Sequence, residues 1–316
     1  MKRKNLISLM MLLILTALSA CEKVVVEEPA KKGTKATRVV TISPVEEQIQ
    51  ISETPMTRGS MAGKVYAVNV FQKTGKAKSY SKYAYGLFTD PSKIAVVMTE
   101  GSKYKIECLI VQDGDEAVYN NNGEYLAPFL HGQGLPTKAA NVFVKSTTEN
   151  LGRINRGTTN LSATDSIRCP KVSKQYCVVD DFDPASSDHV TLGMRRAVFG
   201  LHFKITPPEE GCLTVYYLSR TIDVKSSDPA YDKNSVYSFN IVDAAIAEGY
   251  HGDVTMKMKW KKDDGTVEEY SKKVTLKRNI ITTIEISAKG PAPHSIGFSE
   301  ESGALGEETV KWQVGK

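Results

Sequence analysis

The stretch RAVFGLHFKI, residues 196–205, carries apolar side chains at every second position. In an extended chain, successive side chains point to opposite faces, so a period of two gathers apolar side chains on one face. One face would carry Ala197, Phe199, Leu201, Phe203 and Ile205, with Val198, His202 and Lys204 opposite. The stretch therefore predicts a β-strand with one face in a core and the other in water.

The same period recurs along the chain. KYKIECLI, residues 103–110, would place Tyr104, Ile106, Cys108 and Ile110 on one face of a half-buried strand, and residues 254–262 alternate Val254, Met256, Met258 and Trp260 with Thr255 and lysines. Asp264 and Gly265 suit the left-handed positions of a tight turn and predict a hairpin over residues 253–276. Only residues 242–249, VDAAIAEG, suggest a helix, ending at Gly249. The expected fold class is all-β, with two tandem antiparallel β-sandwiches and few short helices.

The first residues have the layout of an export signal. A cationic MKRK precedes an apolar run, and LSAC ends that run with small residues before Cys21. The layout resembles a bacterial lipobox, in which the leader is removed and the cysteine is acylated. We therefore expect a signal peptide over residues 1–20, lipidation of Cys21 and a polar tether over residues 21–36. An ordinary secretory leader followed by a chance cysteine is the alternative.

Composition and length indicate a folded, nearly neutral chain of two domains. The 316 residues are 41% hydrophobic and 24% charged, as in ordinary globular proteins. Without the three cations of the leader, 38 Lys and Arg oppose 36 Asp and Glu, so no field would steer nucleic acid and no such partner is expected. The polar stretch 145–193 predicts long loops. We expect β-sandwich domains over residues 37–190 and 191–316.

Sequence motifs for catalysis are absent. The chain has no G-x-S-x-G elbow, H-E-x-x-H pair, P-loop or Rossmann glycine pattern, and its five histidines are scattered. We expect neither enzymatic activity nor a cofactor. Asp180, Asp181 and Asp183 are weak candidates for calcium, because the stretch DDFDPASSD lacks the glycine and terminal glutamate of an EF-hand loop. A solvated acidic turn is the alternative.

Four cysteines remain after Cys21, and their spacing fits no zinc site. Cys169 and Cys177 could close a small loop through a disulfide in an exported protein. Cys108 lies in the strand-like run KYKIECLI and is expected to be buried as a small hydrophobe.

Together these features resemble the fimbrillin-type lipoproteins of Gram-negative anaerobes. The likeness rests on the LSAC box, a tether, a first strand, a Thr-Arg joint, and the stretches YAYGLF, GSKYKIE, MRRAVFGLHFKI and LKRNIITTIEIS. The resemblance implies two transthyretin-like sandwiches, a lipid anchor in the cell outer membrane and maturation by an arginine-specific protease. It also implies that the cut removes the first strand and that a strand of another subunit fills the groove by β-augmentation.

Carried onto this chain, the resemblance makes residues 37–52, TRVVTISPVEEQIQIS, the removable strand and places the cut between Arg58 and Gly59. Small, polar residues flank Arg58, as a protease site needs. Arg38 is a second possible cut site, and a cut there would leave the first strand in place.

The chain end offers a donor strand. Val310, Trp312 and Val314 alternate with Lys311 and Gln313, after a stretch that contains Gly and Pro. The alternative is that residues 309–314 pair within their own domain.

Two kinds of function follow from the sequence. The first is a structural or adhesion protein of fimbriae, whose partners are the outer membrane, other subunits or copies of itself, and a host protein or glycan; an uncut anchor subunit is a variant. The alternative is a surface lipoprotein that does not polymerise and binds a glycan or protein through sandwich loops. The two functions differ in whether a protease removes residues 22–58 or the chain keeps them.

Overall fold

The computed structural model describes residues 35–47, 63–112, 118–126, 128–129, 134–152, 154, 169, 171–288, 300–301 and 306–314. Strands dominate these residues, so the predicted all-β fold class is confirmed. The helical segments among them are the short α2 (Val242–Ala245) and the single 3-10 turn η1 (Pro91–Lys93). Within the described ranges, no helix has the length and apolarity that crossing a bilayer requires.

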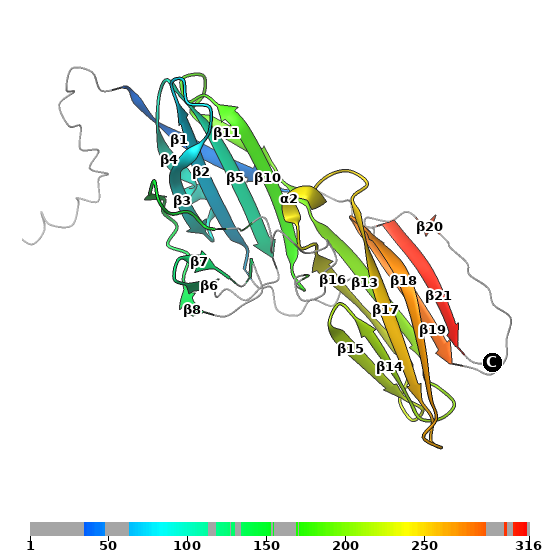
Figure 1. Cartoon of the computed structure of the whole chain (residues 1–316). Helices are drawn as coiled ribbons and strands as arrows, with labels where there is room; N and C mark the ends of the chain where they lie inside the picture. The colour runs from blue at the N-terminus through cyan, green and yellow to red at the C-terminus, as the bar shows by residue number, and fades with distance from the viewer. Residues whose placement is uncertain are drawn as a thin grey trace, which may run out of the picture. The chain divides into compact units, whose positions relative to one another are not determined.

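The first half of the folded chain forms one six-stranded sheet and two three-stranded sheets (Figure 1). The β1 sheet has the strand order β11 (His189–Gly193), β1 (Thr37–Val45), β4 (Ala95–Thr99). The six-stranded sheet has the order β12 (Arg195–Arg196), β10 (Ser173–Phe182), β5 (Ser102–Gln112), β2 (Val65–Thr74), β3 (Ser81–Phe88), β9 (Val144–Lys145). The other three-stranded sheet has the order β7 (Glu124–Tyr125), β6 (Val118–Asn121), β8 (Leu135–Thr137).

The β1 sheet and the six-stranded sheet enclose an apolar core, which we call the first core. The β1 sheet and the segments beside it contribute Val40, Ile42, Ile94, Val96, Met98, Val190, Leu192 and Met194. The six-stranded sheet contributes Tyr66, Val68, Val70, Ala84, Phe88, Tyr104, Ile106, Cys108 and Ile110. The period of two along each strand produces this face, because every second side chain points inward.

The second half of the chain forms another pair of sheets. The β21 sheet has the order β16 (Tyr231–Ser238), β13 (Val198–Thr206), β19 (Ile280–Ala288), β21 (Gly306–Val314), β20 (Glu300–Glu301). The β17 sheet has the order β15 (Arg220–Lys225), β14 (Cys212–Tyr217), β17 (His251–Lys261), β18 (Val267–Lys277).

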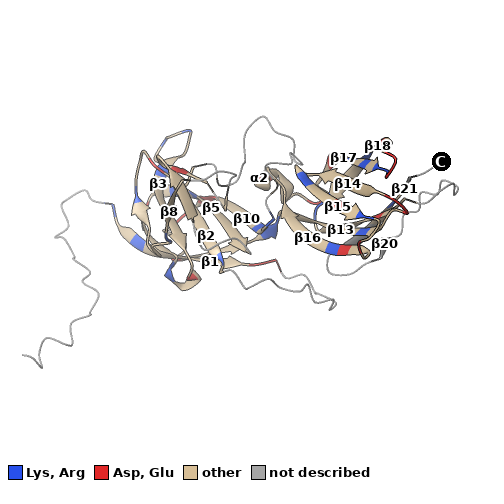
Figure 2. Cartoon of the chain, turned by 90° about the horizontal axis from the view of Figure 1, so that it is seen from below, with Lys and Arg blue, Asp and Glu red and all other residues tan. Residues whose placement is uncertain are grey.

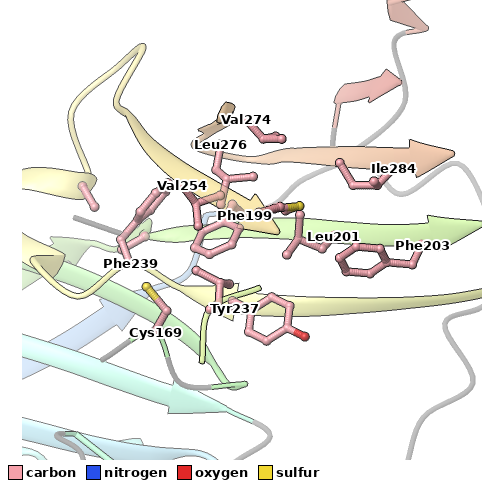
Figure 3. Close-up of a cluster of buried hydrophobic side chains, with 14 of the residues drawn as sticks. Cys169, Phe199, Leu201, Phe203, Tyr237, Phe239, Val254, Val274, Leu276 and Ile284 are labelled. Atoms are coloured by element: carbon pink, nitrogen blue, oxygen red, sulfur yellow. The ribbon is translucent and has the colours of Figure 1, made fainter. Parts of the chain in front are cut away.

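Both sheets of the second half contribute to another apolar cluster, which we call the second core. Phe199 of β13 packs there against Tyr237 and Phe239, with ring centroids 5.7 and 4.7 Å apart (Figure 3). The predicted inward set, Ala197, Phe199, Leu201, Phe203 and Ile205, is entirely within this core. The inward face of the stretch is therefore confirmed, whereas Val198, expected on the face in water, is buried as well.

The predicted hairpin over residues 253–276 is confirmed as β17 and β18. Its turn is closed by hydrogen bonds from the Lys262 amide to Thr266 O and from the Gly265 amide to Lys262 O, at 2.9 and 3.1 Å. Gly265 has a φ of +86°, which glycine adopts without strain, and the Asp264 carboxylate accepts a hydrogen bond from the Thr266 amide. The expected left-handed position is therefore taken by Gly265, while Asp264 caps the turn.

Three expectations need correction. The polar stretch 145–193 contains β10 and β11, and β10 pairs with β5 over most of its length. β5 is buried on both faces because Leu109 and Val111 of its second face join the second core. The helix at 242–249 has only the single turn α2. The domain division at residue 190 stays a prediction.

Gly200 permits a close approach of β13 and β19. A Cβ at this position would lie 2.7 Å from Cγ1 and 3.2 Å from Cα of Ile281. We expect Gly200→Ala to lower the free energy of unfolding by about 1–3 kcal/mol, because the strands must separate to fit the methyl group. Gly193→Ala is the matched control, since no atom lies within 4 Å of its added Cβ. Urea unfolding of both variants checks this, and equal stabilities would contradict it.

Candidate assembly site at the first and last strands

β1 is the middle strand of its sheet. It runs antiparallel to β4, with Val40 opposite Val96, and parallel to β11, with Ile42 opposite Val190 (Figure 1). Hydrogen bonds also join the Ile42 amide to Ile94 O and the Met194 amide to Val45 O, both at 2.8 Å. Removal of β1 would therefore leave unpaired backbone groups on both β4 and β11.

β1 also fills the first core. The side chains of Val40 and Ile42 are fully buried, whereas Val39 and Val45 on the outer face are more than half exposed. Burial of a valine or isoleucine side chain contributes about 1.5–3 kcal/mol. The groove left without β1 would thus be apolar at its floor and polar at its edges.

A set of polar contacts holds the end of β1, and we call it the Glu47 network. The Glu47 carboxylate accepts hydrogen bonds from the Arg196 amide at 2.7 Å and from Arg278 Nη2 at 2.8 and 3.0 Å. Arg278 Nε donates to Arg196 O at 2.7 Å. Arg278 follows β18, and its side chain is only 9% exposed. Water therefore screens this ion pair less than an exposed pair.

Glu46 extends the Glu47 network on its other side. Its carboxylate pairs with Lys64 Nζ at 2.6 Å and accepts a hydrogen bond from Gln175 Nε2 at 3.1 Å. The Gln175 Oε1 atom accepts from the Glu47 amide at 3.2 Å. Residues of β10, β12 and the β18–β19 turn thus bind the two glutamates that follow β1.

The pKa of Glu47 reflects these contacts. Burial on its own would raise the pKa of the carboxyl group, but the Arg196 amide and the charge of Arg278 stabilise the carboxylate more strongly. The pKa therefore lies below its ordinary value, and the charged form binds the network.

β21 is the last described strand in sequence, and it pairs in parallel with β19 of the same chain. Val310 and Trp312 point into the second core, 6% and 8% exposed. Lys272 Nζ donates to Lys311 O at 2.9 Å, and Lys311 Nζ lies 3.6 Å from the Glu285 carboxylate. Val314 is opposite Ala288. The donor role of Val310, Trp312 and Val314 stays a prediction.

The outer edge of β21 is largely open among the described strands. β20 pairs only with Glu307 and Glu308, so residues 309–314 have a ladder partner on one side, β19. β1 pairs with β4 over residues 37–41 and with β11 over residues 41–45, five register partners in each. β21 has nine register partners in β19 and two in β20, so its ladder is almost entirely on one side.

The other predicted site residues are placed as follows. Arg38 is the second residue of β1, opposite Met98, and pairs with Glu100 at 3.1 Å. Cys21, Arg58 and Gly59 lie outside the described residues. Their lipidation and cleavage stay predictions.

Two of the three calcium candidates pair with lysines. Asp181 accepts hydrogen bonds from Lys73 Nζ at 2.6 Å and Tyr80 OH at 2.7 Å, and Asp183 pairs with Lys103 Nζ at 2.9 Å. Asp180 is an exposed residue of β10. In the described ranges, no group of three or more His, Cys, Asp or Glu side chains is arranged to hold a metal ion.

The two cysteines of the predicted disulfide contact different cores. Cys169 belongs to the second core (Figure 3). Cys177 packs against the first core. Cys108, Cys177 and Cys212 are free thiols in this structure, so the Cys169–Cys177 disulfide stays a prediction. Cys108 is buried, as expected.

Sequence reasoning missed a polar pocket of about 480 Å³ at the β21 sheet. Across four strands its charges alternate, because the register aligns Asp232, Lys204, Glu285 and Lys311 in one row. Tyr231 and Trp312 also line it. Only the strand register brings these residues together, so no local motif signals the pocket.

Charged residues of both signs occur on both halves of the folded chain (Figure 2). Surface ion pairs such as Lys73–Asp181 and Lys273–Asp253, each 2.6 Å long, mix the two signs locally. Such pairs contribute little to stability.

Comparisons with known proteins give distant structural likenesses. No family model and no curated protein matches the chain. A candidate adhesin from Bacteroides ovatus has a TM-score of 0.33 and 10% identity, covering 76% of this chain and 83% of its own. A candidate cell adhesion protein from Bacteroides eggerthii has a TM-score of 0.36 and 8% identity, covering 88% and 98%.

The fimbrial anchor protein Mfa2 from Porphyromonas gingivalis has a TM-score of 0.28 and 11% identity, covering 74% of this chain and 82% of its own. Structural likenesses at these TM-scores do not indicate a function for this chain.

The Glu47 network is testable by charge removal. Glu47→Gln keeps the size of the side chain but weakens its pairing with Arg278, and we expect it to lower the free energy of unfolding by about 1–2 kcal/mol. Glu269→Gln is the matched control, because Glu269 is 72% exposed and lies 3.6 Å from Lys259. The control should change stability by less than about 0.5 kcal/mol. Urea unfolding compares them, and equal losses would refute a special role for Glu47.

The same variant predicts a pH dependence. The pKa of Glu47 in the folded chain lies below its ordinary value of 4.5, so the unfolded chain takes up the proton first as the pH falls. The stability supplied by Glu47 is therefore complete above about pH 4.5 and is lost as the pH falls through the folded pKa. The difference in unfolding free energy between wild type and Glu47→Gln should shrink below that pH. A constant difference from pH 7 to pH 3 would contradict this.

Proposed function

We propose that this chain is an exported, lipid-anchored fimbrial or adhesion protein that assembles when β1 is cut away and replaced by the C-terminal strand of another subunit. The central place of β1 supports the proposal most directly. A strand with partners on both sides and two buried side chains leaves a groove of defined shape when it is removed. An incoming strand satisfies the same backbone groups.

The contacts of Arg38 favour Arg58 as the cleavage site. A protease binds its substrate as an extended chain, and Arg38 is hydrogen bonded within β1 and paired with Glu100. Cleavage there requires local unfolding of the strand and would remove only its first two residues. A cut after Arg58 would release β1 together with Glu46 and Glu47. Arg58 is therefore the proposed site.

The strand that would leave and the strand that would replace it have the same pattern of buried side chains. β1 and β21 each have nine residues, and each carries two inward apolar side chains two positions apart: Val40 and Ile42 in β1, Val310 and Trp312 in β21. Among the described residues, residues 309–314 of β21 have a ladder partner on one side only. Detaching that part of β21 breaks ladder bonds to β19 alone.

Cleavage of the purified chain tests the proposal. An arginine-specific protease should produce a new N-terminus at Gly59 and, with it, multimers that resist detergent on a gel. Arg58→Lys, which keeps the charge but removes the recognised side chain, should show neither product. N-terminal sequencing and gel mobility are the measurements. A chain cut at Gly59 that keeps β1 bound and stays monomeric would refute strand exchange.

The donor can be tested separately. A chain lacking residues 306–316 should be cut normally but form no multimers alone, because it has a groove and no donor strand. Addition of the intact cut chain should give mixed multimers. A shortened copy should be the last subunit of each, because it accepts a strand but donates none. Multimers of the shortened chain by itself would show that β21 is not the donor. Circular dichroism before cleavage verifies that the shortened chain is folded.

The alternative function is a monomeric surface protein that binds a glycan or a protein. The pocket at the β21 sheet favours this reading, because charged side chains of both signs line it. Lys311 and Trp312 of β21 line that pocket, so donation of β21 would dismantle it. A monomer that is never cut and binds a glycan there would support the alternative.

A further inference from the structure

Two cysteines far apart in sequence are direct neighbours in the six-stranded sheet. Cys108 of β5 and Cys177 of β10 are register partners in an antiparallel pair. The register is regular here: Tyr176 is opposite Leu109 and Val178 is opposite Glu107, and the only shift comes later, between Val179 and Phe182. The pair therefore lies in an undistorted part of the ladder.

Both side chains point to the same face. Cys108 belongs to the first core together with Ile106 and Ile110, and Cys177 packs against that core together with Val179. Directly opposite residues on one face of an antiparallel pair have Cβ atoms about 4.5–5.5 Å apart and Cα atoms about 4.5 or 5.5 Å apart. Both Cα spacings fall within the range of about 4.4–6.8 Å found in disulfides, and the Cβ atoms need to approach to about 3.5–4.5 Å when the bond forms.

Neither of the other two cysteines of the folded chain offers this geometry to Cys177. Cys169 lies in the second core. Cys212 lies in β14 of the β17 sheet, opposite Lys225 and Lys261. In the described residues, Cys108 and Cys177 form the one cysteine pair aligned across a ladder.

We propose that Cys108 and Cys177 form a disulfide that joins β5 to β10 once the chain meets a disulfide-bearing oxidant. The Cys177 thiolate attacks a sulfur of the oxidant, which releases one thiol and leaves a mixed disulfide on Cys177. The Cys108 thiolate then attacks the Cys177 sulfur and expels the second thiol. The two cysteines lose two electrons and two protons in total, and the oxidant is reduced to two thiols.

The burial of the pair determines when it reacts. Cys108 is fully buried and Cys177 is partly exposed. Burial raises the pKa of both thiols, so the reactive thiolates are scarce in the folded chain. The bond should therefore form while the chain folds, before the first core closes over Cys108, and the oxidised bond should then be protected from reductants.

The bond would cross-link the sheet that faces β1. Val40 and Ile42 of β1 lie in the same first core as Cys108. A bond between β5 and β10 closes a long loop of chain and limits the unfolded state, which stabilises the folded sheet. The proposal does not depend on strand exchange, since both strands stay in the chain after a cut at Arg58.

Refolding in a glutathione redox buffer tests the bond directly. The full chain carrying Cys21→Ser is unfolded, reduced, refolded with reduced and oxidised glutathione, alkylated in denaturant and mapped by mass spectrometry. We expect a peptide that links Cys108 to Cys177, two alkylated cysteines, and a thermal midpoint several degrees above that of the reduced chain.

Matched variants locate the bond. Cys177→Ala should leave three alkylated cysteines and no link, and its thermal midpoint should no longer respond to oxidation. Cys212→Ala should keep the link and leave one alkylated cysteine. A link between Cys177 and Cys169, or four alkylated cysteines in wild type after redox equilibration, would overturn the proposal. Because export and cleavage play no part in this experiment, its failure would leave the proposed function unaffected.

Discussion

The structure depends on one constraint: the backbone groups of β4 and β11 must find partners in the gap between them. β1 supplies those partners on both sides, and Val40 and Ile42 close the core below. A buried backbone amide or carbonyl without a partner costs as much as a lost hydrogen bond. β1 therefore completes the β1 sheet and closes the first core. Glu47, which follows β1, also contacts Arg278 of the second half.

Local patterns predict much of the fold, and their failures have physical causes. The alternation in residues 196–205 and the Gly265 turn lead directly to β13 and the β17–β18 hairpin, because one face of each strand meets a core. β10 was missed because its sequence, SKQYCVVDDF, ends in acids and has no clean alternation. β5 was read as half-buried because alternation does not reveal that Leu109 meets a second core.

The candidate site divides in the same way. The first and last strands can be found from sequence, since each is a short alternating run near a chain end. The Glu47 network cannot, because Glu47, Arg196 and Arg278 meet only after both sheets have formed. The pairing of Cys108 with Cys177 also requires the strand register, whereas loop spacing suggested Cys169 instead. Contacts between residues far apart in the chain cannot be predicted from local sequence patterns.

The parallel pairing of β1 with β11 has a kinetic consequence. Thr41 is opposite His189, 148 residues later in the chain, so the first strand cannot be sheltered on that side until most of the first half exists. Contacts between such distant residues slow folding, since a long loop must close first. Before then β1 can pair with β4 but not with β11, so one side of its backbone lacks a ladder partner. At that stage an extended segment of another copy can pair with the open side of β1, so mispairing between copies increases with their concentration.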